Sequence, residues 1–265
     1  MVYFLLLIIA PMNIIFKELS LEEVPIMKLY FFNRKQIGRF MVLLLLVIVT
    51  GVGIYGYQGS KDVEVTGDES LGIYRGNTEI KAMTLTFNVD WGETEIPKIL
   101  RILKENNVKA TFYLTGRWAD KFPKLAKQIA SEGHEIGNHS YSHPHVDNLS
   151  ISKNIAQIKK AENSILKNTG QKPRLYAPPY GEKKEHVKKA AAQAGYVTVY
   201  WTIDTIDWQK ERTPQIISDT VLKKAQNGAI VLMHPVPNTV EALPEIILGL
   251  KERGYSLKTV SEIIE

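Results

Sequence analysis

The chain has 265 residues, of which 45% are hydrophobic and 23% charged, a composition typical of a globular protein with a substantial core. Its net charge of +5 is too small to indicate a nucleic-acid-binding surface, which requires clustered basic side chains. Because the chain contains no cysteine, disulfides, thiolate metal sites and a cysteine nucleophile are excluded.

Residues 1–57 are expected to anchor the chain in a membrane. Residues 40–57 carry no charge, and this stretch is long enough to cross a bilayer as one helix. Residues 27–39, just before it, are basic and contain no acidic side chain, which by the positive-inside rule keeps this flank in the cytoplasm. We therefore expect a single-pass protein of the cell membrane with an extracytoplasmic C-terminal domain.

Two alternatives explain the N-terminal region less well. A buried core helix is seldom apolar on every face, and no clear A-x-A-like cleavage site follows the apolar run, as a cleaved signal peptide would require. Residues 1–26 lack a basic region and are interrupted by Pro11, so we expect the natural start at Met27. Residues 58–79 are polar and glycine-containing, as in a stalk, which leaves residues 80–265 as the outer domain.

Within the outer domain, short β-rich runs alternate with amphipathic stretches. The residue pattern predicts strands at 82–89, 109–115, 134–140, 174–181, 197–204, 228–234 and 255–260. Helices are predicted at 95–106, around 125–130, and near 150–168, 183–194, 213–226 and 241–252. The outer domain contains about seven such units, which predicts an α/β fold with a parallel sheet. Because a complete barrel has eight units, seven indicate a distorted (β/α)7 barrel.

Function in such folds lies at the carboxyl ends of the strands. The residues with reactive or ligating side chains fall there: Asp90, His139, His143, Tyr180, Asp204, Asp207 and His234. Structural roles are an alternative for the candidate residues. For example, His234 can be a packed strand-end histidine, and Asp204 can cap the following helix. Trp208, which follows Asp207, can belong to the core.

Two histidines four residues apart, His139 and His143, can face one ion, and imidazole suits zinc and related divalent metals. Such a pair alone is weak evidence, because histidines without a ligand role are common. Ser140 follows the first histidine where zincin proteases have glutamate, which excludes that class. Because side chains alternate along a strand, Asn88 and Asp90 point the same way, so Asp90 can be a third ligand.

Two histidines and one carboxylate are also the metal-ligand set of the non-haem iron oxygenases. Those enzymes are usually built on all-β folds, which the alternation of strands and helices does not support.

Together these features resemble the polysaccharide deacetylase family, also known as the NodB homology domain or carbohydrate esterase family 4. The resemblance covers about residues 80–262 and rests on five short motifs in family order. They are Thr86–Gly92, His139–His143, Ala177–Gly181, Asp204–Trp208 and Leu232–His234. The single anchor and short stalk look most like the sporulation-associated members.

The resemblance implies hydrolysis of the acetamide of N-acetylated sugars, with Zn²⁺ or another divalent metal such as Co²⁺ or Ni²⁺, on a glycan such as peptidoglycan. Asp90, His139 and His143 would hold the metal. His234 would be the general acid, and Asp207 would keep it protonated. Tyr180, Pro179 and Trp208 would bind substrate, with the Tyr180 N–H near the oxyanion.

Two positions depart from the family pattern. The base is normally an aspartate and is Asn88 here, and an amide cannot accept a proton near neutral pH. Loss of a general base typically lowers the rate ~10²–10⁴-fold. The arginine that normally pairs with that aspartate is Ala177. The two changes agree physically, because a buried arginine without its partner would be destabilising.

Three functions remain compatible with these departures. The first is a weak deacetylase in which the metal alone lowers the pKa of its bound water to about 7, so that hydroxide attacks without a base and Arg174 or Asp204 partly substitutes for the missing groups. We favour this function slightly, because a protein that only binds has no need of an acid such as His234 with its Asp207 partner. The second is a catalytically impaired glycan-binding or scaffolding protein of the cell or spore envelope. The third is an extracytoplasmic metal-dependent hydrolase of another acyl group.

Overall fold

Strand β1 (Ala82–Val89) is buried at every position and lies at the centre of the domain. The computed structural model describes residues 72–265, so the expected anchor and leader at 1–57, and most of the stalk, lie outside the described residues. None of the helices in the described part is both long and apolar enough to cross a membrane.

All pairings of the named strands are parallel. Strand β1 pairs with β2 (Thr111–Leu114), β7 (Ile230–Met233) and β8 (Ser256–Leu257). The remaining strands are β3 (Glu135–Asn138), β4 (Leu175–Tyr176), β5 (Val197–Thr198) and β6 (Ile203–Asp204). The order β5-β4-β3-β2-β1-β7-β6, with β8 beside β1, confirms the predicted α/β fold with a distorted barrel of parallel strands.

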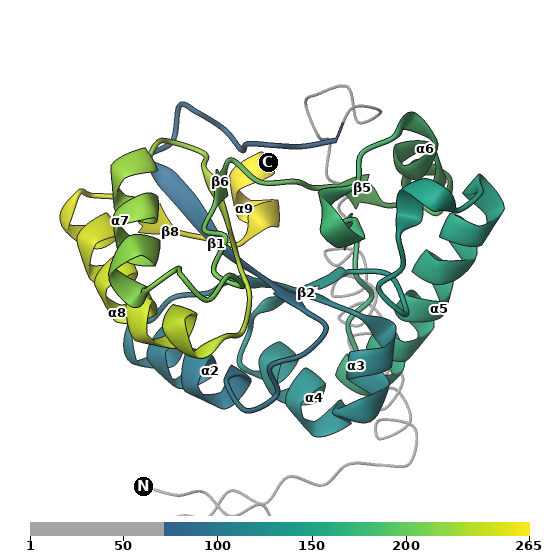
Figure 1. The fold of residues 1–265 in the computed structure, drawn as a ribbon, viewed down its shortest axis with the longest axis horizontal. Helices are drawn as coiled ribbons and strands as arrows, with labels where there is room; N and C mark the ends of the chain where they lie inside the picture. Colours follow the sequence, from purple (N-terminus) through teal and green to yellow (C-terminus); the bar gives the residue numbers. More distant parts are fainter. Residues whose placement is uncertain (1–71) are drawn as a thin grey trace, which may run out of the picture. The chain divides into compact units, whose positions relative to one another are not determined.

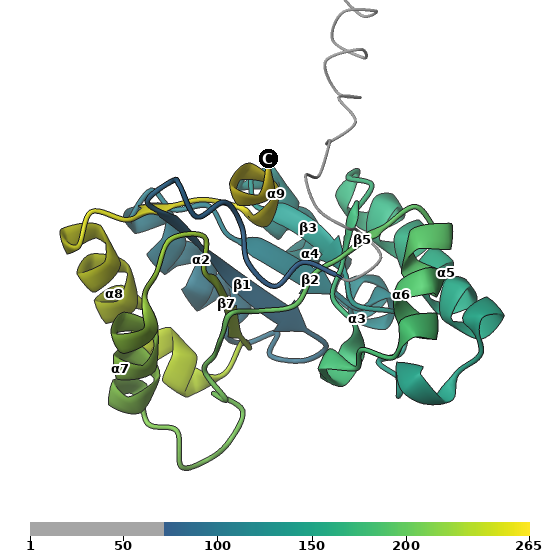
Figure 2. The same ribbon diagram turned by 90° about the horizontal axis from the view of Figure 1, so that it is seen from above.

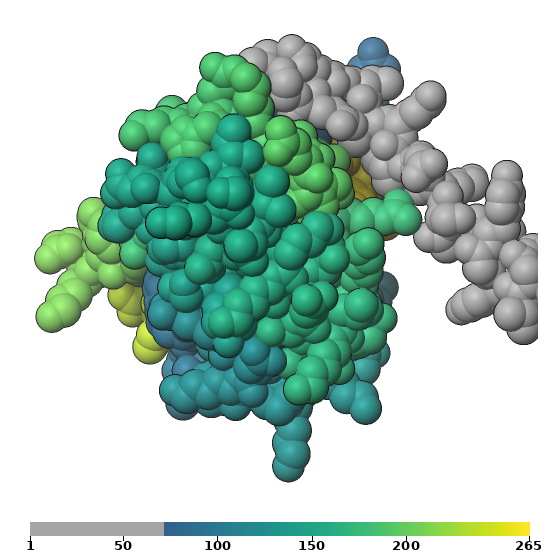
Figure 3. Space-filling model, turned by 90° about the vertical axis from the view of Figure 1, so that its right-hand side faces the viewer, coloured from purple at the N-terminus to yellow at the C-terminus, as the bar shows by residue number. Residues whose placement is uncertain are grey.

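Helices surround this sheet, as Figure 1 shows. They are α2 (Ile96–Glu105), α3 (Gly116–Lys121), α4 (Pro123–Ser131), α5 (Ile151–Thr169), α6 (Glu185–Gln193), α7 (Pro214–Lys224), α8 (Pro237–Glu252) and α9 (Val260–Ile264), with short 3₁₀ turns η2 (Val146–Asn148) and η3 (Pro179–Gly181). Viewed from above, α7 and α8 flank one side of the sheet and α5 and α6 the other (Figure 2). Helix α5 makes much of the outer face on that second side (Figure 3).

Strand β1 separates an apolar layer from a polar interior. Its odd-numbered side chains, such as Leu85 and Phe87, pack with the helices, and Phe87 stacks on Phe112 at 4.9 Å between ring centroids. Its even-numbered side chains include Thr86 and Asn88, which are also buried but polar. The alternation along one strand therefore turns Asn88 away from the apolar layer that contains Phe87.

The prediction of a single strand at 197–204 is wrong. This run forms two strands, β5 and β6, which lie at opposite edges of the sheet. The chain crosses between them, and the N-terminal segment lies along this crossing. Ile73 forms a bridge with Val199, the Tyr200 N–H donates to the Ile73 carbonyl at 2.7 Å, and Tyr74 stacks on Tyr200. These contacts satisfy backbone groups at the edge of β5 without a β5–β6 ladder.

Gly137 in β3 is required by close contact with the Tyr113 ring. A Cβ at position 137 would lie 2.2 Å from Cδ1 of Tyr113, whose side chain is fully buried. We expect Gly137→Ala to reduce the free energy of unfolding by about 1–3 kcal/mol through overpacking. Urea unfolding checks this. In a Tyr113→Leu background the same alanine should be much less destabilising, and an equal loss in both backgrounds would exclude the clash as its cause.

His134 should make stability depend on pH. Its ring is buried, its Nδ1 accepts the Ala110 N–H at 3.2 Å, and burial lowers the pKa of His134 to about 4. The unfolded chain has the ordinary value near 6.5, so between these limits only the unfolded state binds the proton. Stability therefore increases with pH across this window, by about 3 kcal/mol in total from this group.

In His134→Asn, the side-chain oxygen can still accept the Ala110 N–H. The free energy of unfolding, measured in urea between pH 4 and 7, should change less steeply with pH than in the natural protein. Equal slopes for the two proteins would contradict the assignment to His134.

Candidate functional site

The strand ends bring most of the predicted site residues together. His139 and His143 follow β3, and their ring centroids are 4.8 Å apart. Tyr180, in the turn after β4, contacts His143 edge to face at 4.5 Å. His234 follows β7 and is bonded to Asp207, which follows β6. The parallel arrangement therefore places these side chains at one end of the barrel, as the sequence predicts.

The loop from β3 shapes the histidine pair. His139 is buried, and its Nδ1 lies 2.6 Å from the Ala177 carbonyl, which can only accept, so Nδ1 carries the proton and Nε2 is left as an acceptor. Burial lowers the pKa of His139 to about 3, which keeps the imidazole neutral. Positive φ angles at Ser140 (65°) and His143 (54°) turn the chain back, so that the second ring meets the first.

Asp90 is engaged by two neighbours. Its Oδ1 accepts Thr115 Oγ1 at 2.8 Å and Arg117 Nε at 2.7 Å, and Arg117 Nη2 donates to its Oδ2. Burial raises the pKa of Asp90, but the hydrogen bonds from Arg117 and Thr115 and the arginine charge together hold it below its ordinary value. The carboxylate is thus ionised and already neutralised by a guanidinium.

The positions of Asp90, His139 and His143 show whether these three side chains are arranged to bind the expected metal ion. Neutral imidazoles such as His139 suit a divalent ion, but among residues 72–265 there is no group of three His, Asp or Glu side chains placed to hold one. His139 and His143 lie together, whereas Asp90 is taken up by Arg117. The donor set does not fit a metal in this arrangement, and the ligand roles of Asp90, His139 and His143 remain predictions.

Asn88 lies in the barrel interior with an unused hydrogen-bonding atom. Its side chain is only 6% exposed, and its Oδ1 makes no hydrogen bond with the described part of the chain. Its neighbour across the ladder, Tyr113, has a buried hydroxyl that is likewise without a partner there. Ala177 is buried and belongs to the same apolar cluster as Tyr113. Asn88 offers an amide, which can hydrogen-bond but is no base.

On the other side of the site, the Asp207 carboxylate accepts several hydrogen bonds. His234 Nδ1 lies 2.8 Å from Asp207 Oδ1. Asp207 Oδ2 accepts the His234 backbone N–H at 2.6 Å and Thr239 Oγ1 at 2.5 Å. The buried carboxylate therefore fixes the ring orientation and leaves Nε2 of His234 directed away from it, which is the geometry of a positioned proton donor.

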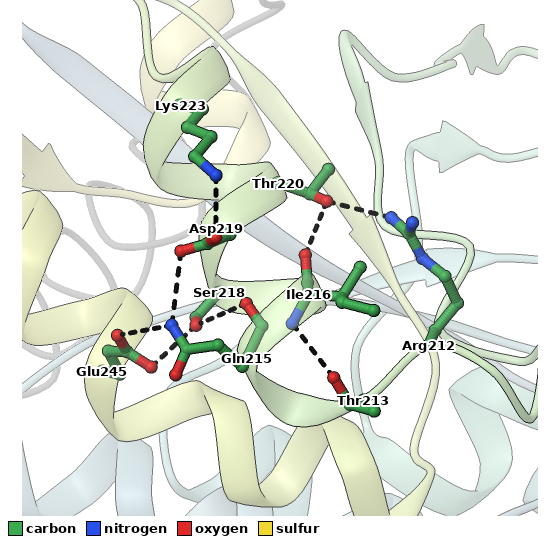
Figure 4. Close-up of polar contacts among 9 residues, drawn as sticks. All are labelled: Arg212, Thr213, Gln215, Ile216, Ser218, Asp219, Thr220, Lys223 and Glu245. Atoms are coloured by element: carbon green, nitrogen blue, oxygen red, sulfur yellow. Dashed lines mark hydrogen bonds and ion pairs between the residues drawn. The ribbon is translucent and has the colours of Figure 1, made fainter.

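The loop that carries Asp207 and Trp208 is tied to the helices beside it. Arg212 Nε donates to the Thr205 carbonyl at 2.9 Å, and its Nη2 donates to Thr220 Oγ1 on α7 (Figure 4). The Arg212 carbonyl accepts Asn238 Nδ2 of α8. These contacts anchor both ends of the loop, so that the position of Asp207 is set by α7 and α8.

Helices α7 and α8 are in turn bonded to each other. Ser218 Oγ donates to Glu245 Oε2 at 2.7 Å, and Gln215 contacts the same carboxylate (Figure 4). Asp204 does not cap α7, because Thr213 accepts the Ile216 N–H there. Instead Asp204 Oδ1 accepts the Ile206 N–H at 2.9 Å and shapes the start of the loop.

Three exposed aromatic residues surround the site. Trp208 is 57% exposed and Tyr180 58%, so Trp208 is not a core residue. Pro179, next to Tyr180 in the chain, is buried. Tyr180 stacks on His145 at 4.1 Å. Trp91, which is 42% exposed, lies parallel to the His234 ring at 5.5 Å. Exposed flat rings of this kind are suited to contact with the faces of sugars.

The sequence alone missed Trp91, Thr115, Arg117 and His145 as parts of the site. Trp91 has a signal, because it directly follows Asp90 at the end of a buried strand. Thr115 and Arg117 follow the adjacent strand β2, and strand-end position could have suggested them. His145 lies two residues after His143, and its pairing with Glu182 Oε1 at 2.7 Å depends on a residue far away in sequence.

Known proteins resemble this chain in sequence and in fold. The family model described as polysaccharide deacetylase matches residues 75–199. YlxY of Bacillus subtilis is 43% identical over 73% of this chain, which covers 60% of that relative's length. The peptidoglycan-N-acetylmuramic acid deacetylase PdaA of B. subtilis is 34% identical, and the match covers 72% of this chain and 74% of PdaA.

Solved structures give a similar result. BA3943 of Bacillus anthracis, described as a CE4 family pseudoenzyme, has a TM-score of 0.71 and 44% identity, with 73% of this chain and 68% of that chain covered. A BA3943 mutant described as having restored enzymatic activity also has a TM-score of 0.71, with 42% identity and coverage of 73% and 71%.

Removal of one hydrogen bond to Asp207 tests how much that bond contributes to the stability of the Asp207–His234 pair. In Thr239→Val the shape is kept, but the buried carboxylate loses a charge-assisted donor, so we expect about 1–3 kcal/mol less free energy of unfolding. Urea unfolding is the measurement. Thr220→Val, at a partly exposed hydroxyl of α7, is the control and should be less destabilising. An equal effect of the two changes would contradict the role of Thr239.

Proposed function

Because the chain belongs to the polysaccharide deacetylase family, we propose that it binds N-acetylated glycans such as peptidoglycan and that its own deacetylase activity is impaired. One observation carries the second part of the proposal. The position expected to hold the general base is Asn88, a buried amide whose Oδ1 has no partner in the described structure. A group that cannot accept a proton cannot activate a water molecule as a base.

Glycan binding is supported by the surroundings of the site. Trp91, Tyr180 and Trp208 are large exposed aromatic side chains around one end of the barrel. Relatives of the chain are named for peptidoglycan, including PdaA and a Bacillus cereus peptidoglycan-N-acetylglucosamine deacetylase that is 39% identical. These two observations favour an N-acetylated glycan such as peptidoglycan over other acylated substrates.

Residual hydrolysis of the acetamide is the second candidate, and the Asp207–His234 pair favours it. With its Nδ1 held by Asp207, His234 can donate a proton from Nε2 to a leaving amine. The proposal includes a divalent ion for any such activity, either Zn²⁺, Co²⁺ or Ni²⁺. It also includes a membrane anchor at residues 40–57, which places residues 80–265 outside the cell. Attachment to the spore envelope is a narrower form of the same proposal.

Restoration of the missing groups tests the proposal. The double variant Asn88→Asp/Ala177→Arg returns the base and its cationic partner, and we expect acetate release to increase by about 10²-fold or more. The measurement is acetate released from N-acetylglucosamine oligomers and from spore peptidoglycan by the full-length chain, with zinc chloride in excess. Sedimentation with insoluble peptidoglycan measures binding in parallel.

The control adds His234→Ala to the double variant and should lose the gained activity while it keeps peptidoglycan binding. Acetate release by the natural protein at the rate of the double variant would disprove impairment. Absence of both binding and acetate release for all variants would disprove the glycan assignment.

A further inference from the structure

Arg117 lies beside the histidine pair and belongs to a different element. It is the second residue of α3, which follows β2 directly. The backbone N–H groups of Gly116 and Arg117 donate to the carbonyls of Ser140 and Tyr141, at 3.0 and 2.9 Å. The start of α3 is therefore fixed to the loop that carries His139 and His143, so Arg117 has a defined position at this site.

From that position Arg117 uses both oxygens of Asp90. Its Nε donates to Oδ1 at 2.7 Å and its Nη2 to Oδ2, while Thr115 adds a third hydrogen bond to Oδ1. Two parallel donors on one carboxylate form the stronger, geometrically specific type of ion pair. The Asp90 side chain is only 8% exposed, so the arginine, which is 49% exposed, covers a carboxylate that water scarcely reaches.

A divalent cation would have to compete with this pair. Three of the roughly four lone-pair sites of the Asp90 carboxylate already accept hydrogen bonds, two of them from Arg117. An ion bound at Asp90 would therefore lie beside the guanidinium, and two positive groups repel each other at short range. The two histidines alone are neutral and give only two donor atoms. A site with two imidazoles and a carboxylate already neutralised is a weaker site than one with a free carboxylate.

We propose that the guanidinium of Arg117 occupies the place of a metal ion's charge at Asp90, and that it thereby limits the affinity of this chain for divalent metals. The inference goes beyond the proposed function, because it concerns metal affinity and holds for a hydrolase and for a binding protein alike. It also explains why the described residues form no three-ligand group around His139 and His143.

Zinc titration of the full-length chain tests the inference. With zinc chloride in isothermal titration calorimetry, Arg117→Ala should bind one Zn²⁺ at least about tenfold more tightly than the natural protein, as loss of a competing charged hydrogen bond implies. Arg117→Lys keeps the charge but loses the two-pronged geometry, and it should fall between the two. Arg101→Ala, at an exposed arginine of α2, is the matched control and should leave zinc affinity unchanged.

A second measurement guards against a variant that is merely unstable. Without metal, Arg117→Ala should melt at a lower temperature because Asp90 loses its partner, and zinc should raise that temperature more than it does in the natural protein. Adding His139→Ala should abolish the gain in zinc affinity if the ion binds at this site. Equal zinc affinity of the natural protein and Arg117→Ala would overturn the proposal, whatever the acetate assays give.

Discussion

The site depends on β1, which is buried along its whole length and pairs in parallel with β2, β7 and β8. Parallel pairing fixes where neighbouring strands end, and the residues just past those ends are the ones that meet. Asn88 lies in β1 and Asp90 directly follows it, Thr115 and Arg117 follow β2, and His234 follows β7. A shift of β1 by one residue would exchange the Phe87 and Asn88 faces, so the apolar packing of Phe87 also determines where Asn88 points.

The two sides of the site differ in how completely their polar groups are paired. Asp207 accepts three hydrogen bonds, whereas Asn88 Oδ1 and the Tyr113 hydroxyl make none with the described residues. The bonds to Asp207 also hold the start of α8 through Thr239, so the buried carboxylate has a structural role in addition to any role in proton transfer. Retention of Asp207 and His234 is therefore compatible with binding alone, because loss of Asp207 would leave buried donors unpaired.

Much of this was predictable from sequence, because the information is local. Strand and helix periodicity predicted the α/β barrel, and strand-end position predicted that His139, His143, Asp207 and His234 would gather. The division of the run at 197–204 into β5 and β6 was not predictable, since it depends on contacts of Tyr200 with the distant segment around Ile73. The engagement of Asp90 by Arg117 was missed for a similar reason, because an arginine near a strand end has many possible partners.

The crossing from β5 to β6 has a consequence for the shape of the barrel mouth. In a fully hydrogen-bonded barrel, diameter follows from strand number and stagger. Here the two edge strands are joined by the connecting residues 199–202 and by the segment at 73–75, with no direct ladder between them. The distance between these two edge strands is therefore not determined by strand number and stagger alone. A change in the length of this connection would therefore alter the width of the opening while the paired strands keep their register.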